Sequence, residues 1–197
     1  MSNPNAPIIS GAVMLDKVIG EIQEGLFDGL SWLDVAFGRA QRITRMVEGR
    51  KYILPNVYCG GWKGHGPNDY IEVSPDAKIG NFSFFAVEDP QALGVGPWAR
   101  TITAPFGLVF WFDLRKAFNS ATNRNTEYLK AQALHLLEGR DGWHLPGGRI
   151  TINRCFEQAE NIYRGYSLNE IDNQYLMHPY GGFRLEGTLM FDEYCAI

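Results

Sequence analysis

The loop at residues 60–66 concentrates the residue types that could do chemistry. Its sequence, GGWKGHG, combines glycines that could approach a phosphate with one lysine and one histidine. A phosphate-binding P-loop needs Ser or Thr directly after its lysine, and here Gly64 follows Lys63. No amphipathic helix follows to direct its N-terminal dipole at an anion. We therefore interpret this loop as a partner-contacting segment rather than a nucleotide site.

The histidines do not follow a metal-binding spacing. No HxH, HExxH or HxxxH pattern occurs among the four, which are His65, His135, His144 and His178. Three of them lie in Gly/Pro-rich loops, and loops can converge in space. A metal site still needs three or four ligands aimed at one point. We expect solvated or hydrogen-bonded histidines, and no metal or cofactor.

Cysteines leave one enzymatic alternative open. The chain has three, Cys59, Cys155 and Cys195, without a CxxC pair, which favours reduced thiols over a disulfide framework or a structural zinc site. Cys59 beside the Gly-rich loop is the only one we consider as a nucleophile. A small hydrolase built on loop residues would require at least two of Cys59, His65, His144 and His178 to converge in one pocket.

Tryptophans in loops provide a second alternative. Trp62, Trp98 and Trp143 lie in segments rich in glycine or proline, so a carbohydrate- or peptide-binding module is conceivable. The acidic residues are scattered, without an obvious pair for glycoside hydrolysis. Exposed loop tryptophans more often mark a protein interface, because large aromatic side chains are enriched there.

Size and composition are those of an ordinary globular protein. The chain has 197 residues, 45% of them hydrophobic and 20% charged, with a net charge of −4. We expect one domain over 1–197 and no broad basic surface for nucleic acid. The first ten residues lack the basic and apolar regions of a signal peptide, and no apolar run approaches the length of a membrane span.

Periodicity predicts an α+β fold with a single mixed, mostly antiparallel sheet, helices on one face and long inserted loops. Residues 1–9 should form an extended N-terminal segment, and 59–70 and 88–105 long loops. Helices are expected at 11–26 (with Ser10 as its cap), 30–37 and 126–138. The expected strands are a hairpin at 40–58 turning at Glu48–Gly49, and then 70–73, 79–87, 106–114, 149–156 and 183–194.

The last strand has the clearest pattern in the sequence. From Phe183 to Glu193 one set of alternate positions is mostly apolar and the other mostly polar, which is typical of a half-buried strand. The strand stands at the end of the sequence, and we expect it to be committed to the fold or to an assembly. Arg184 and Glu186 lie on its polar side, where they either contact a partner or form a solvated sheet face.

The order of these elements resembles that of the tail-terminator and tail-completion proteins of long-tailed bacteriophages. The ending YGGFRLEGTLMFDEYC also resembles the last strand of uncharacterised prophage-type proteins encoded among tail genes. The insertions at 59–70 and 88–105 are larger than in the simple pattern, which leaves the position in the neck or tail open. The resemblance implies a closed homo-oligomeric ring, commonly a hexamer, that caps the tail tube and joins it to the head. It further implies a virion protein assembled in the host cytoplasm, contacts with tail tube and head-completion proteins, and DNA that passes through the lumen without specific binding.

The sequence therefore favours a structural protein over an enzyme. No catalytic constellation is evident, and the insertions have the composition of interface loops. Our predicted interface residues are Trp62, His65, Trp98, Arg184 and Glu186.

Overall fold

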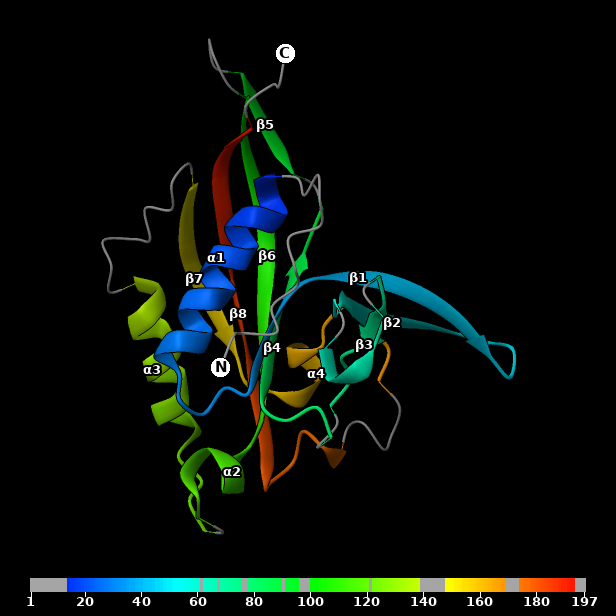
Figure 1. The fold of residues 1–197 in the computed structure, drawn as a ribbon, viewed down its shortest axis with the longest axis vertical. Coiled ribbons are helices and arrows are strands. Elements are labelled where there is room, and N and C mark those ends of the chain that lie inside the picture. The colour runs from blue at the N-terminus through cyan, green and yellow to red at the C-terminus, as the bar shows by residue number, and fades with distance from the viewer. Residues whose placement is uncertain are drawn as a thin grey trace.

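One mixed sheet of eight strands organises the part of the chain that the structure describes. This computed structural model describes residues 14–60, 62–66, 68–75, 78–89, 91–95, 100–120, 122–138, 148–168 and 174–193. Its elements follow in Figure 1 as α1 (Met14–Gly29), β1 (Val35–Val47), β2 (Arg50–Tyr58), η1 (Trp62–Gly64), β3 (Tyr70–Glu72), β4 (Phe82–Val87), β5 (Ala92–Val95), β6 (Arg100–Asp113), α2 (Leu114–Phe118), α3 (Thr126–Glu138), β7 (Gly148–Phe156), α4 (Ala159–Ile162) and β8 (Tyr180–Glu193).

The strands are arranged in the order β3-β2-β1-β4-β6-β8-β7, and β5 pairs with the first residues of β6. Only the β1–β4 pair is parallel, and every other pair is antiparallel. β6 and β8 are paired from Arg100–Glu193 to Asp113–Tyr180, so two long strands form the centre of the sheet. The predicted α+β class with one mixed sheet is confirmed.

Helices α1 and α3 cover one face of the sheet and enclose the larger core (Figure 1). Apolar residues at helical spacing give α1 a buried side, and every second residue of β6 and β8 points toward it. The main contributors are Leu15, Val18, Ile19, Ile22 and Leu26 from α1, Phe106, Leu108, Phe110 and Phe112 from β6, and Phe183, Leu185, Leu189 and Phe191 from β8. The predicted alternation of the last strand is thus confirmed.

The opposite face of the sheet is also covered. Ile162 at the end of short helix α4 and Tyr163 directly after it pack with Phe84, Val109 and Trp111 in a second buried cluster. The prediction that helices pack on one face holds for α1 and α3 and is wrong for α4. A sheet buried on both faces explains why residues 106–114 read as a near-continuous apolar run.

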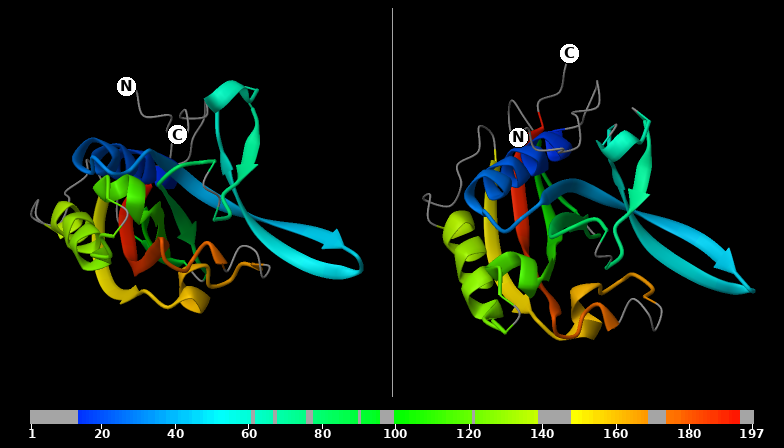
Figure 2. Two further views of the ribbon diagram at one scale, coloured as in Figure 1. Left: turned by 90° about the horizontal axis from the view of Figure 1, so that it is seen from below. Right: turned by 60° about the horizontal axis from the view of Figure 1, so that its bottom comes forward.

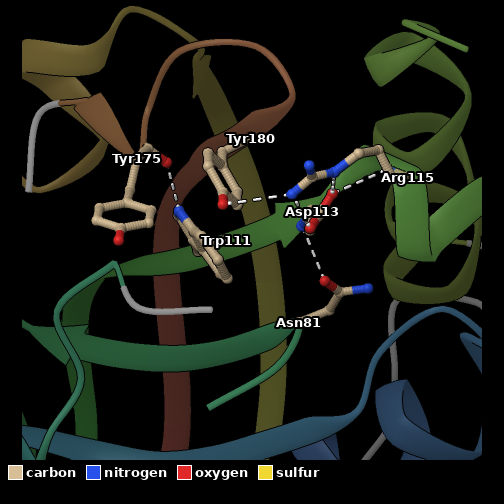
Figure 3. Close-up of polar contacts among 6 residues, drawn as sticks. All are labelled: Asn81, Trp111, Asp113, Arg115, Tyr175 and Tyr180. Carbon is tan, nitrogen blue, oxygen red and sulfur yellow. Dashed lines mark hydrogen bonds and ion pairs between the residues drawn. The ribbon is translucent and has the colours of Figure 1, made fainter. Parts of the chain in front are cut away.

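A polar network ties three strands together at one end of the sheet (Figure 3). Asp113 caps α2 and accepts two hydrogen bonds from the guanidinium of Arg115, which keeps the pKa of this carboxyl below its usual value. Asn81 accepts from the Asp113 backbone N–H at 2.8 Å, and Tyr180 accepts from Arg115 at 3.3 Å. Trp111 donates to the carbonyl of Tyr175. These contacts join β4, β6 and β8, so the network fixes the ends of the strands.

Two predicted segments differ from the structure. The predicted helix at 30–37 is wrong, because β1 begins at Val35 and its backbone pairs with β4. The predicted loop at 88–105 is largely strand, because β5 and the first residues of β6 form an antiparallel pair. Pro105 lies inside β6, where its carbonyl accepts from the Glu88 N–H. In the other predicted loop, 59–70, the 3-10 turn η1 precedes β3.

The predicted hairpin and the helix at 126–138 are confirmed. Glu48 and Gly49 both have positive φ, 50° and 76°, as the tight turn of a two-residue hairpin requires. Asn125 caps α3 by accepting a hydrogen bond from the Tyr128 N–H. The first helix is described from Met14 onward, and Ser10 and the segment 1–9 lie outside the described residues.

Gly187 offers a direct test of the β7–β8 pairing. A Cβ at this position would overlap the carbonyl oxygen of Thr151 in β7. We expect Gly187→Ala to lower the free energy of unfolding by at least about 3 kcal/mol, since backbone cannot move aside cheaply. Urea titration would measure the loss. The control is Gly20→Ala in α1, where a Cβ meets nothing within 4 Å. This change should raise the free energy of unfolding by about 1 kcal/mol, because alanine favours the helix more than glycine. Equal effects of the two changes would contradict this account of the pairing.

Candidate functional site

Two of the predicted interface residues lie in the 59–70 segment. Trp62 is half-buried and packs edge-on against Phe37, with ring centroids 5.3 Å apart, while the Lys63 ammonium lies 4.4 Å from the Trp62 ring. The His65 side chain is 44% exposed and lies 4.0 Å from Asp69. Trp98 lies outside the described residues. Trp62 therefore contributes to packing, and His65 remains accessible.

The cysteine and histidine residues considered for catalysis are only partly described. Cys59 is fully buried, and its thiol donates to the Asp69 carbonyl at 3.2 Å, as in a structural cysteine. His178 is exposed and precedes a cis Pro179. His144, Trp143 and Cys195 lie outside the described residues. Within the described ranges no group of three or more His, Cys, Asp or Glu side chains is placed to hold a metal ion.

Arg184 and Glu186 lie inside the protein rather than on a solvated sheet face. Arg184 is fully buried and Glu186 is 9% exposed. Arg184 Nε donates to Glu186 at 2.8 Å, and its Nη2 donates to Glu88. Arg164 pairs with Glu186 at 2.7 Å from the solvent side. The four residues form an ion network, and Arg184 is not accessible to a partner surface.

Gly107 makes room for this network. A Cβ at Gly107 would collide with the guanidinium of Arg184, which therefore lies directly over the backbone of β6. Arg184 Nη1 is buried without a hydrogen-bond partner among the described residues. The surroundings are poorly solvated, since burial also raises the pKa of nearby Tyr166 to about 12. An arginine held in this way carries a large desolvation cost, which its two carboxylate partners offset. The polar side chains of β8 therefore stabilise the fold.

The ion network continues into a segment that holds the base of the β1–β2 hairpin. Arg164 precedes Gly165, whose carbonyl accepts from Arg42 of β1 at 2.6 Å. Ser167 donates its N–H to the Ile53 carbonyl at 2.7 Å, and its hydroxyl accepts from the Ile53 N–H at 3.1 Å. The hairpin is therefore bonded to the body through both of its strands.

A second set of contacts holds the hairpin from the side of β3. Arg45 pairs with Glu72 at 3.3 Å, and Gln41 donates to the Tyr70 hydroxyl at 3.4 Å. Figures 1 and 2 show that beyond these contacts the hairpin bends away from the sheet and projects from the body. We call residues 41–52 the hairpin arm and residues 46–51 its tip.

The tip exposes apolar side chains together with cations. Met46 is 66% exposed and Val47 is 51% exposed. Arg50 and Lys51 stand opposite them in the register, and within the described ranges the tip side chains have no ion-pair partner. An isolated two-stranded hairpin is marginally stable in water. A ribbon that projects with exposed apolar residues is therefore suited to contact another surface.

A second exposed apolar feature lies on β5. Leu93 is 61% exposed and Val95 is 97% exposed, and β5 pairs only with β6 in the described part of the chain. The strand order ends at β3 and at β7, and edge strand β7 carries exposed Arg149 and Arg154. Charged residues protect an edge strand from unwanted pairing. Edge β7 has this protection, whereas β5 itself contains no charged residue, and among the described residues its only strand partner is β6.

Comparisons with known proteins identify no family for this chain. No model of a known protein family matches the chain, and no curated protein matches its sequence. None of the helices in the described ranges has the length and apolar character needed to cross a membrane. The geometry alone therefore points to surfaces for association, the hairpin arm and β5.

Sequence reasoning located the hairpin but missed its projection. The alternation around Ile43 and Val47 resembles that of any half-buried strand, and only the tertiary contacts show that both sides of the tip face solvent. One signal was present, because four basic side chains fall within residues 42–51 of an acidic chain. Such a density of charge is unusual for a strand pair that packs in a core.

The ion network can be tested by removing its central cation. We expect Arg184→Ala to lower the free energy of unfolding by about 3 kcal/mol, because Glu88 and Glu186 lose the cation that neutralises them. Arg164→Ala serves as the control, since its side chain is 46% exposed and should contribute less than about 1 kcal/mol. Thermal and urea unfolding of both variants would measure the difference. A smaller loss for Arg184→Ala than for Arg164→Ala would contradict the assignment.

Proposed function

We propose that the protein is a non-enzymatic structural component that associates with copies of itself, as expected of a ring-forming tail terminator or neck connector of a bacteriophage. The proposal rests mainly on edge strand β5, which exposes Leu93 and Val95, contains no charged residue, and pairs only with β6 among the described residues. Soluble monomers rarely expose an apolar edge strand, because its free backbone groups invite pairing with another chain. A second copy that covers this edge would remove the hazard.

The geometry favours a head-to-tail contact between copies. β5 and the hairpin arm are different surfaces that leave the body in different directions, with β5 toward the top and the arm toward the right of Figure 1. A contact between unlike surfaces produces a ring when its rotation closes, and a filament when it does not. A closed ring, of six subunits by the resemblance in the sequence, is the form we propose.

The remaining parts of this function come from the resemblance. They are a place in the virion, contacts with tail tube and head-completion proteins, and passage of DNA through the lumen. The net charge of −4 is compatible with a lumen that does not retain DNA, because binding to phosphate relies on cations.

Charge placed on β5 tests the proposal. We expect the wild-type chain to elute at a multiple of its 22.2 kDa mass in size-exclusion chromatography with light scattering. The double variant Leu93→Lys and Val95→Lys should shift toward the monomer mass, because two ammonium groups cannot be buried unpaired in an interface.

Met177→Lys provides the matched control. Met177 is 66% exposed but lies outside the strands, so its variant should retain the wild-type mass. A wild-type chain that remains monomeric at the highest attainable concentration would overturn the proposed function. A β5 variant with the wild-type mass would overturn the role of β5.

A further inference from the structure

We propose that the tip of the hairpin arm, Met46–Lys51, binds the acidic body of a second copy of this chain. The inference rests on the proposed function, self-association, and deepens it by naming the element that reaches the neighbour and the chemistry of the contact. The tip provides apolar area from Met46 and Val47, and two cations from Arg50 and Lys51.

Charge complementarity within the chain favours a second copy as the occupant. Residues 41–52 contain four basic side chains and one acidic side chain, a net charge of +3. Because the whole chain carries −4, the remainder carries −7. Part of this negative charge faces solvent on the outer side of α1, where Glu21, Glu24 and Asp28 are exposed. A basic arm and an acidic body attract each other between copies, and two arms or two bodies repel.

The cations nearest the body are already engaged, which leaves those of the tip for a partner. Arg42 donates to the Gly165 carbonyl and Arg45 pairs with Glu72. Arg50 and Lys51 have no such partner among the described residues. Because the base is fixed by Arg42, Arg45 and Ser167, the arm is held in one direction, and less conformational entropy is lost when the tip binds.

Nucleic acid is the main competing occupant, since a two-stranded ribbon fits the major groove of DNA. The charge of −7 on the body opposes approach to polyphosphate, and two cations at the tip would give weak attraction. The exposed Met46 and Val47 gain more from an apolar contact than from a phosphate backbone. The described surface therefore favours protein over DNA.

The experiment compares two tip variants with a charge-matched control. The apolar variant is Met46→Ser with Val47→Ser, and the charge variant is Arg50→Glu with Lys51→Glu. Arg149→Glu with Arg154→Glu on edge β7 changes charge equally at exposed positions away from the arm. Sedimentation velocity over a concentration series gives the dissociation constant, and circular dichroism verifies folding of each variant.

We expect each tip variant to raise the dissociation constant at least about 30-fold, as when a contact at the centre of an interface is removed. The control should change it less than about threefold, as at a peripheral position. In the wild type, added salt should weaken association and should act less on the charge variant.

The outcomes separate the two proposals. An oligomeric wild type with unaffected tip variants would overturn the arm inference and leave the proposed function standing. A monomeric wild type would overturn both. Binding of a short DNA duplex that is lost in the charge variant, with the oligomer mass unchanged, would assign the arm to nucleic acid instead of a second copy.

Discussion

The segment after α4 and the base of the hairpin both depend on the ion pairs of the buried Arg184 guanidinium. It lies over Gly107 in β6 and is neutralised by Glu88 and Glu186. Placing an arginine there requires a residue without a Cβ beneath its guanidinium, here Gly107, and two carboxylates within hydrogen-bonding reach. These requirements link β8, β6 and the end of β4 to Arg164 of the segment after α4.

That linkage explains how a thin hairpin can project from the body with a defined direction. The segment that begins at Arg164 also provides Gly165 and Ser167, which bond to Arg42 and Ile53 of the hairpin. The ion network therefore supports the segment, and the segment supports the base of the arm. A projecting ribbon held in this way is preorganised for binding, whereas a free hairpin would lose more conformational entropy on contact.

Sequence patterns predicted the elements whose burial is one-sided and local. Apolar alternation predicted the strand from Phe183 to Phe191, and the residues Glu48–Gly49 predicted the hairpin turn. Helical spacing and an N-terminal cap predicted the helix at 126–138. All three are confirmed. Residues 30–37 were predicted as a helix and are partly strand, because pairing with β4 overrides their local preference. The polar side of β8 reads as solvated in sequence, and only the tertiary structure reveals that Arg184 is buried with its partners.

Site-specific cross-linking tests the central claim, association through the arm tip, most directly. A photo-reactive amino acid would replace Met46 in a mixture of isotopically light and heavy copies, and mass spectrometry would identify the joined peptides. We expect cross-links between light and heavy copies that connect position 46 to the acidic body. Cross-links confined to single copies, under conditions where the chain is oligomeric, would contradict it.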